Sequence, residues 1–480
     1  MKIFSVVVYV ALYLGIAWAA EDPLRADVYS WDKVDYERLP FDGNTLIGKY
    51  PYYIPENNDI IGVNYHAKSG LMLATVGRFF PGVPSSLNAF CGKDVPAGTS
   101  AKLWGFPDYR KNAPKATYFS VPPHDDSWSV NNTQKRYAVG HLSHYYTHQY
   151  NTGLRNSFYN PLEDINIVSV YRTTLDDRCN RVFAVDSGVL HYSFHEIYDV
   201  QKPSLLVFDI PDNGCITKKF PVLRKVEIPD HLWKNPVGFV YVTVDYQPKT
   251  SCDDVIVYIT NILDNSVVAY DYQTGDFWNI KHHTMNPVFH ESTMDFDGQH
   301  TYDFPYGISN VVLGFPDVYG NRVAFFSPVS SSAEYAVSTR VFKNAKDPSY
   351  KFTPKDFTFV GHRGCGTQAF RQVLDLTTGV MFFGDMQLKK IRCWNTQQAL
   401  SPDTVGVVYE SELIQSISDM NLDSNGDLWF HTSHLPLDYL IRRPLNTTIV
   451  NSRSFKINAA EVIRGTVCDT PPLYRREDVY

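Results

Sequence analysis

One pattern of apolar and polar positions recurs along the chain. A short run of alternating apolar residues is followed by a polar turn rich in Asp, Asn or Gly, and then by a second apolar run. Such alternation is typical of β-strands, and Asp-Gly or Asn-Gly pairs favour hairpin turns. From the second copy onward the spacing is roughly 50 to 70 residues, as expected for propeller blades. The six copies are Ile60–Gly77, Val168–Gly188, Phe239–Asn261, Tyr306–Ser327, Gln368–Gly384 and Ile417–Thr432.

Additional strands follow several of these copies. Ser204–Ile210, Ser266–Tyr272 and Lys389–Trp394 are further apolar runs of strand length. One such sheet cannot bury its apolar face alone, whereas blades arranged radially cover every face and leave only short edges. Helical periodicity is nearly absent, apart from a short turn near Glu410–Gln415. We therefore predict an all-β fold, a six-bladed β-propeller with four-stranded blades.

The spacing between the first and second copies is much longer than the others. The intervening segment Pro107–Glu163 is polar, aromatic and histidine-rich, and shows almost no alternation. It lacks the apolar content for a core of its own. We expect an inserted loop region on one face of a single propeller domain that covers residues 20–480.

The first residues have the features of a signal peptide. Met1–Ala19 combines an early Lys2 with an apolar run, and it ends in the small-x-small pattern Ala17-Trp18-Ala19. No later stretch approaches about 20 uninterrupted apolar residues, the length of a membrane span. Two glycosylation sequons begin at Asn131 and Asn446. These features predict a soluble, secreted, extracellular glycoprotein.

Composition and charge narrow the function classes. Aromatic residues at 14% and hydrophobic residues at 44% suffice for a large core. The net charge of −7 is spread along the chain without a long run of one sign. A nucleic-acid-binding surface and a polybasic membrane-binding segment are therefore not expected.

Seven cysteines are scattered along the chain, without a CxxC pair, which disfavours a zinc ribbon. In an oxidising compartment two or three disulfides are expected, and the odd number leaves at least one thiol over. Cys179 and Cys252 occupy similar turn positions in adjacent units, where a disulfide would join two hairpins. Cys393 and Cys468 could close the last blade. The remaining cysteines are Cys91, Cys215 and Cys365.

Several segments, in order from about residue 30 to residue 470, resemble the Yellow / major royal jelly protein family of insects. They are Ile54–Asn58 (IPENN), Arg78–Leu87 (RFFPGVPSSL), Cys179–Gly188 (CNRVFAVDSG), Leu205–Pro211 (LLVFDIP), Asp253–Thr260 (DDVIVYIT), Tyr306–Ser309 (YGIS), Gly361–Gln368 (GHRGCGTQ), Ile391–Thr396 (IRCWNT) and Asp419–Phe430 (DMNLDSNGDLWF). The resemblance implies a six-bladed propeller, in agreement with the number of copies.

The resemblance implies several functions rather than one. Family members take part in cuticle pigmentation, resemble dopachrome-converting enzymes, bind biogenic amines in saliva, or serve as nutritive or eggshell components. This chain also departs from the family pattern. Its Pro107–Glu163 insertion is longer than typical, Cys91 and Cys215 look like additions, and Cys365 is an extra cysteine near Arg363.

Under the family reading, loops that follow the repeated motifs meet around a central channel, where propellers bind ligands. An aromatic wall with one or two acids would suit a protonated amine, through cation–π contact and a charge-assisted hydrogen bond. The alternative is that these side chains are turn-capping groups and core aromatics. The candidate residues are Asp186, Ser187, Asn261, Tyr306, Phe326, Gln368 and Asn421.

Metal binding and catalysis have weaker support. One histidine group (His124, His141, His144 and His148, with Asp125 and Asp126) lies in the insertion, and a second comprises His282, His283, His290 and His300. Neither matches a tight ligand signature, so we expect no metal and no cofactor. A calcium set of Asp186, Asn261, Asp385 and Asn421 is a minor alternative. Because catalytic signatures such as Gly-x-Ser-x-Gly are missing, the catalytic residues stay unassigned.

These observations favour a non-enzymatic extracellular protein acting in cuticle, eggshell or pigment deposition. Its expected partners are matrix, cuticle or eggshell proteins, and a small catechol or indole amine that could bind in the central channel. One alternative is a melanin-pathway enzyme that converts dopachrome, in which a central acid or histidine shifts a proton. Another is a salivary protein that binds biogenic amines.

Overall fold

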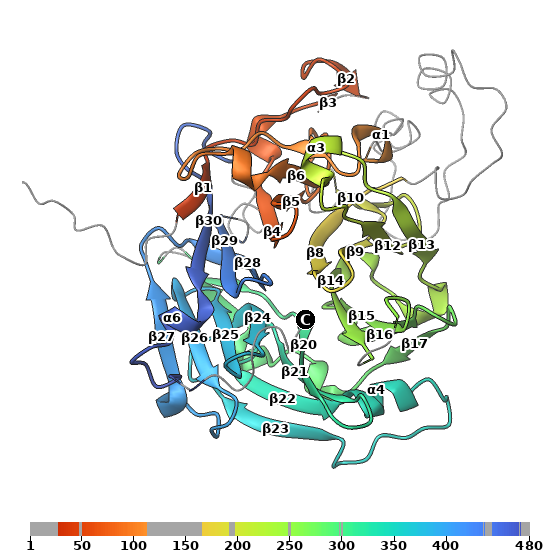
Figure 1. Ribbon diagram of the computed structural model, residues 1–480, viewed down its shortest axis with the longest axis vertical. Coiled ribbons are helices and arrows are strands. Elements are labelled where there is room, and N and C mark those ends of the chain that lie inside the picture. Colours follow the sequence, from red (N-terminus) through yellow and green to blue (C-terminus); the bar gives the residue numbers. More distant parts are fainter. Residues whose placement is uncertain are drawn as a thin grey trace, which may run out of the picture.

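The computed structural model describes residues 27–47, 50–112, 166–191, 197–247, 251–296, 298, 301–434, 436, 444–469 and 471. Six four-stranded antiparallel sheets are arranged around a central axis (Figure 1). The predicted six-bladed β-propeller with four-stranded blades is therefore confirmed. Each copy of the repeated pattern forms the first two strands of one blade. The first strands of successive blades lie next to one another around the ring.

The strands of the blades follow one another along the chain. Blade 1 comprises β4 (Ile60–His66), β5 (Leu71–Val76), β6 (Leu87–Cys91) and β7 (Trp104–Gly105). Blade 2 comprises β8 (Val170–Asp176), β9 (Arg181–Asp186), β12 (Ser204–Asp209) and β13 (Val222–Glu227). Blade 3 comprises β14 (Phe239–Tyr246), β15 (Val255–Asn261), β16 (Ser266–Asp271) and β17 (Phe277–Ile280).

The second half of the ring continues this order. Blade 4 comprises β20 (Ile308–Pro316), β21 (Arg322–Pro328), β22 (Ala333–Ser338) and β23 (Phe357–His362). Blade 5 comprises β24 (Ala369–Asp375), β25 (Val380–Asp385), β26 (Lys390–Asn395) and β27 (Val405–Glu410). Blade 6 comprises β28 (Ser416–Leu422), β29 (Asp427–Ser433), β30 (Ser452–Asn458) and, outermost, β1 (Asp27–Trp31).

Short elements connect the blades. Among the described residues, three strand pairs lie outside them: β2 (Leu46–Ile47) with β3 (Tyr50–Pro51), β10 (Val189–His191) with β11 (Ile197–Asp199), and β18 (Thr293–Asp295) with β19 (Thr301–Asp303). The α-helices are α1 (Tyr109–Asn112), α3 (Gly214–Thr217), α4 (Thr339–Asn344) and α6 (Ala459–Val462). The 3₁₀ turns are Pro55–Asn57, Gly92–Asp94, Asp230–Leu232, Pro236–Gly238, His283–Met285, Phe289–Glu291 and Pro402–Thr404. Within the described ranges, no helix is long and apolar enough to cross a membrane.

The core lies between the faces of adjacent blades. Strand β12 shows how this arises, because successive side chains of a strand point to opposite faces. Leu206 and Phe208 pack in the cluster shared with blade 1, whereas Leu205 and Val207 pack in the cluster shared with blade 3. Each blade is thus buried on both faces, which explains the nearly continuous apolar runs in the sequence.

Strand β1 closes the ring. It comes from the beginning of the described chain and pairs antiparallel with β30, near its end, with Trp31 opposite Ser452. Trp31 is buried and donates its indole N–H to the Ala101 carbonyl (2.9 Å) in blade 1. The closing strand therefore joins the last blade to the first.

Disulfides link neighbouring parts of the ring. Cys179 is bonded to Cys252, between blades 2 and 3, and Cys393 to Cys468, which are the two pairings raised from the sequence. A third disulfide joins Cys91 at the end of β6 to Cys215 in α3. The remaining cysteine, Cys365, is exposed and free.

The ends of the long connection between blades 1 and 2 are held together. Residues 113–165, which include most of the predicted insertion, lie outside the described residues. On either side of them, the Ile167 N–H donates to the Lys111 carbonyl (2.6 Å). The buried Arg78 guanidinium donates to the carbonyl oxygens of Asn112 (2.6 Å) and Ile167 (3.1 Å).

Candidate functional site

The fold gathers loops of all six blades at one end of the central channel. Because the first two strands of each blade are antiparallel, the first strand begins at the end of the channel where the second finishes. Segments that precede the first strands and follow the second strands must therefore meet there.

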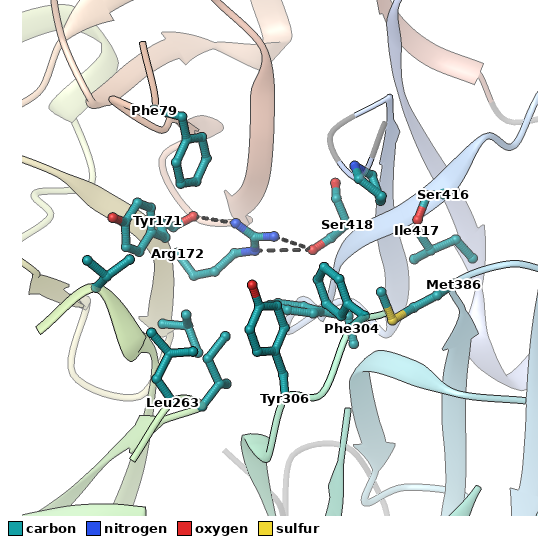
Figure 2. A pocket seen from close by; sticks show the side chains of 15 residues that line it. Phe79, Tyr171, Arg172, Leu263, Phe304, Tyr306, Met386, Ser416, Ile417 and Ser418 are labelled. Carbon is teal, nitrogen blue, oxygen red and sulfur yellow. Dashed lines mark hydrogen bonds between the residues drawn. The ribbon is translucent and has the colours of Figure 1, made fainter. Parts of the chain in front are cut away.

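A pocket occupies this end of the channel (Figure 2). The cavity measures about 120 Å³, and every blade or the loop before it contributes to its wall. Its lining is mostly aromatic and aliphatic. The residues are Phe79, Tyr171, Arg172, Val237, Val240, Ile262, Leu263, Phe304, Tyr306, Phe370, Met386, Ser416, Ile417, Ser418 and Pro436.

Two aromatic pairs form opposite parts of the wall. Phe79, which follows β5, stacks on Tyr171 of β8 with ring centroids 5.1 Å apart. Phe304 and Tyr306, in the segment before β20, meet edge to face at 4.1 Å. No acceptor or donor partner is found within the described chain for the Tyr306 hydroxyl, which points toward the middle of the group in Figure 2. These rings offer flat apolar faces and a hydroxyl to a small ligand.

Arg172 is the charged side chain of the lining. Its Nε and Nη2 donate to the Ser418 carbonyl (3.1 and 2.7 Å), and its Nη1 donates to the Tyr171 carbonyl (2.7 Å), as Figure 2 shows. The guanidinium lies 5.3 Å from the centroid of the Phe370 ring. Arg172 therefore bridges the start of β8 to the start of β28 at the base of the pocket.

A polar network lies beside Arg172 in the channel. Asp419 is 3.8 Å from Arg371 Nε and accepts from the Val63 N–H (3.1 Å). Arg371 contacts the Tyr241 hydroxyl and lies over the Tyr241 ring at 3.6 Å. Asn421 accepts from the same hydroxyl (2.9 Å). This network fills the channel below the apolar walls.

Burial shifts the protonation equilibria of the site. Burial lowers the pKa of Arg172, and the negative charge of Asp419 opposes that shift. Burial raises the pKa of Asp419, against the effect of Arg172 and Arg371. The pKa of Tyr171 rises to about 12, and burial also raises the pKa of Tyr306. The phenols of Tyr171 and Tyr306 therefore stay protonated at neutral pH. The fifteen lining residues include neither a carboxylate nor an imidazole.

Gly62 makes room for this arrangement. A Cβ atom at this position would lie 2.9 Å from Arg172 Cδ and 2.9 Å from Asp419 Oδ2, closer than side chains tolerate. Gly62 in β4 therefore allows the two charged side chains to meet in the channel.

Of the seven candidate residues predicted from the sequence, one lines the pocket and six do not. Tyr306 lines the pocket. Ser187 lies behind the wall, where its hydroxyl is 3.5 Å from the Tyr171 hydroxyl. Asn261 accepts from the N–H groups of Leu263 (3.1 Å) and Asp264 (2.9 Å), and so shapes the turn that carries Leu263 into the wall.

The other four candidates make structural contacts. Asp186 accepts from the N–H groups of Val168 and Ser169, both at 2.8 Å. Gln368 donates to the Glu291 carbonyl (2.8 Å), and Asn421 belongs to the channel network. Phe326 is fully buried within blade 4, where it packs against Tyr335 and Phe357.

Sequence reasoning missed most of the pocket. Arg172 carried a signal, since it is a charged residue directly after the apolar Val170 and Tyr171 at the start of the first strand. Phe79 and Phe304 lie in connecting segments where the hydrophobic pattern gives no register. Their convergence depends on the ring closure, which no local pattern encodes.

The described residues include only some of the possible metal ligands named from the sequence. His282 stacks on Phe357 with centroids 3.8 Å apart, and His290 is exposed. In the ranges that the structure covers, no group of three or more His, Cys, Asp or Glu side chains could hold a metal ion. Asp385 of the calcium set pairs with Arg392 (2.6 Å). The histidines of the insertion (His124, His141, His144 and His148), with Asp125 and Asp126, and also His300 lie outside the described residues.

One of the two sequons lies in the described part of the chain, and the other does not. Asn131 lies outside the described residues. Asn446 is exposed, and its side-chain oxygen accepts from the Thr448 hydroxyl (2.7 Å). An exposed asparagine is compatible with glycan attachment.

Comparisons with known proteins agree with the fold. Residues 168–468 match the family model "Major royal jelly protein". The chain is 33% identical over 310 residues to the Yellow-related salivary protein SP03 of Phlebotomus perniciosus, covering 64% of this chain and 75% of the relative. It is 27% identical over 419 residues to L-dopachrome tautomerase yellow-f of Drosophila melanogaster, covering 87% and 83%. A match of this extent, together with the six blades, shows that the chain belongs to the Yellow / major royal jelly protein family.

Proposed function

We propose that this chain is an extracellular protein that binds a small planar aromatic molecule, a catechol or an indole, in the pocket at the end of the channel. The observation that carries the proposal is the aromatic lining of a cavity to which each blade, or the loop before it, contributes. Pockets of this kind, mostly apolar with a few convergent polar groups, are the usual sites for small ligands.

The size and shape of the cavity suit one or two rings. A cavity of about 150 Å³ holds a benzene molecule, and this pocket measures about 120 Å³ with additional space toward its open side. The Phe79–Tyr171 and Phe304–Tyr306 pairs can contact a flat ligand by stacking or edge-to-face packing. A long or branched ligand would not fit between them.

Three disulfides and the salivary relatives support an extracellular location. Within that setting, we assign the protein to cuticle, eggshell or pigment deposition, where catechols and indoles are the reacting molecules. Its partners there would be matrix, cuticle or eggshell proteins. Localisation of the tagged protein in epidermis, ovary and salivary gland would choose among these roles.

Calorimetric titration tests the ligand. We expect saturable binding of 4-ethylcatechol or 3-ethylindole, and about a tenfold loss in affinity when Phe370→Leu removes one ring of the wall. The matched control Phe359→Leu changes an exposed phenylalanine on the outermost strand of blade 4 and should leave affinity unchanged. No heat of binding with any catechol or indole would refute the proposal.

A second candidate is conversion of dopachrome, which the similarity to yellow-f favours. Tautomerisation of dopachrome needs a base that removes a ring-carbon proton. The lining provides phenols with raised pKa values but no carboxylate or imidazole, so binding is better supported than catalysis. The loss of dopachrome absorbance with purified protein decides the matter. A rate above that of buffer would establish the enzyme.

A further inference from the structure

The charge of the pocket bears on which aromatic ligands it accepts, provided that the proposed function holds. Among the fifteen lining residues, one side chain is ionised at neutral pH, and it is the Arg172 guanidinium. The acidic groups that act on it, chiefly Asp419 and more weakly Asp59, are not part of the lining. Among the described lining residues, a ligand in the pocket therefore meets a cation and no carboxylate.

Arg172 keeps hydrogen-bonding capacity toward a ligand. A guanidinium has five N–H bonds, and the described contacts of Arg172 use three of them, to the carbonyl oxygens of Ser418 and Tyr171. These contacts fix the plane of the guanidinium. One N–H on each terminal nitrogen has no partner in the described chain, and two N–H groups of one guanidinium can bind a carboxylate in bidentate fashion.

The surroundings strengthen this interaction. Arg172 is 3% exposed, and the Phe370 ring lies against its guanidinium. Charge-assisted hydrogen bonds gain strength where water is excluded. A protonated amine in the same place would face a like charge, and no acid among the described lining residues would replace its lost hydration.

The Tyr306 hydroxyl supplies a second polar contact. It lies in the wall, in the segment before β20, while Arg172 comes from β8 on another blade. A phenol can donate to a ring hydroxyl or carbonyl of the ligand or accept from an indole N–H. The two groups would thus orient a ring that carries an acidic side arm.

We infer that the pocket selects aromatic molecules that bear a carboxylate, of the arylacetate or indole-carboxylate class, over the corresponding amines, and that Arg172 determines this choice. The inference deepens the proposed function, because it names the charge class of the ligand at the same site.

Matched ligands test the inference on the unmodified protein. The catechol series is 4-ethylcatechol, 3,4-dihydroxyphenylacetate and dopamine, and the indole series is 3-ethylindole, indole-3-acetate and tryptamine. In at least one series we expect the acid to bind about tenfold more tightly than the neutral compound, and the amine to bind more weakly than both.

The outcomes separate the two proposals. Binding in which the amine equals or exceeds the acid overturns the charge selection and leaves the proposed function standing. Binding in which the acid is no tighter than the neutral compound also overturns it. If none of the six compounds binds, the proposed function falls, and the inference falls with it.

A substitution of Arg172 and a control substitution test whether Arg172 causes the preference for the acid. Arg172→Met keeps the length of the stem, and Asp419 retains Arg371 as its ion-pair partner. We expect its affinity for the acid to fall about tenfold, to that of the neutral compound. Arg340→Met, on the exposed surface of α4, is the control. Unchanged preference in Arg172→Met would overturn the assignment, and if that variant does not fold, the comparison of acid, neutral and amine ligands on the unmodified protein still decides.

Discussion

Two buried ionisable side chains outside the pocket respond to pH in opposite directions. Glu334 in β22 accepts from Arg363 (2.9 Å) and Gln372 (2.8 Å), and burial raises its pKa to about 7. His431 in β29 makes hydrogen bonds with Ser454 (2.9 Å) and the Ile60 carbonyl (2.8 Å), and burial lowers its pKa to about 3. Since the carbonyl can only accept, the neutral ring must carry its proton on Nε2.

Glu334 should make the folded protein less stable as pH rises. The folded state holds the proton of this carboxyl to about pH 7, whereas the unfolded state loses it near pH 4.5. Its contribution to the free energy of unfolding is therefore present below about pH 4.5 and is lost toward pH 7. Urea unfolding across this range should show a fall in the free energy of unfolding that Glu334→Gln lacks, because glutamine does not titrate. The exposed Glu227→Gln is the control, and an identical pH slope in Glu334→Gln would contradict the prediction.

His431 should act in the opposite direction. Its pKa is lowered on folding, so its contribution is complete above about pH 6.5 and is lost as pH falls toward 3. His431→Gln should be less stable at pH 7 and should lose less stability on acidification, as measured by the melting temperature. The exposed His231→Gln should behave like the unmodified protein. An unchanged acid response in His431→Gln would rule out this role.

The roles of single residues were harder to predict from the sequence than the strands or the fold. Asp186 and Asn261 are the last residues of β9 and β15, at the right place in the repeat, but their side chains accept backbone N–H groups and hold turns. The sequence cannot distinguish a polar group that holds a turn from one that faces a ligand, because both lie at the end of a strand. Arg172 and Phe79 meet in the pocket only through contacts between blades.

At the scale of strands, closure of the ring depends on β1. Trp31 is 1% exposed and packs against Phe90 of blade 1, with ring centroids 6.1 Å apart, while its strand pairs with blade 6. Without this strand, blade 6 would expose the edge of β30. The first and last blades would then be joined through β4 and its contacts with β28 and β29, such as Tyr65 with Trp429.

Trp31→Ala should therefore destabilise the protein by about 3 to 5 kcal/mol, the usual cost of removing a buried tryptophan. Chemical denaturation followed by circular dichroism measures the change. Tyr319→Ala, in an exposed hairpin of blade 4, is the control and should shift stability by no more than about 0.5 kcal/mol. A loss for Trp31→Ala as small as that of the control would show that closure does not depend on this side chain.

Strands were the level at which the sequence was most informative. All six predicted hairpins form the two inner strands of a blade. They could be predicted because both faces of these strands are buried and the turns between them are short. The runs Ser204–Ile210, Ser266–Tyr272 and Lys389–Trp394 correspond to third strands. The outer strand β1 was not predicted, since its five residues pair with a segment at the opposite end of the sequence and no local pattern records that pairing.

At the scale of the whole molecule, the disulfides are unevenly distributed. Two of them link blades 1 to 2 and 2 to 3, and the third joins blade 5 to the segment after blade 6. In the described chain, no disulfide joins blades 3, 4 and 5, which are held to one another by packing, by hydrogen bonds such as Gln372 to Glu334 (2.8 Å) and by the Arg322–Asp245 ion pair (3.1 Å). Reducing conditions should therefore weaken the two sides of the ring to different extents.

The Cys179–Cys252 bond spans 73 residues, and its removal by the Cys179→Ser/Cys252→Ser double variant should lower the free energy of unfolding by about 4 kcal/mol. The measurement is denaturant unfolding without reductant. Cys365→Ser removes the free, exposed thiol and should change little. Equal effects of the two substitutions would mean that the cross-link contributes nothing to stability.

The contacts that Arg78 makes with both ends of the connection between blades 1 and 2 bear on which changes of that connection the fold tolerates. Arg78 binds the carbonyl oxygens of Asn112 and Ile167, and the Ile167 N–H donates to the Lys111 carbonyl, so the two ends of the connection are held side by side. Because these contacts hold the two ends without using the residues between them, we expect the blades on either side to keep their geometry when the length of the connection changes. Residues 113–165 could thus be exchanged for a short glycine-serine bridge, or for a foreign peptide, while the ring still assembles.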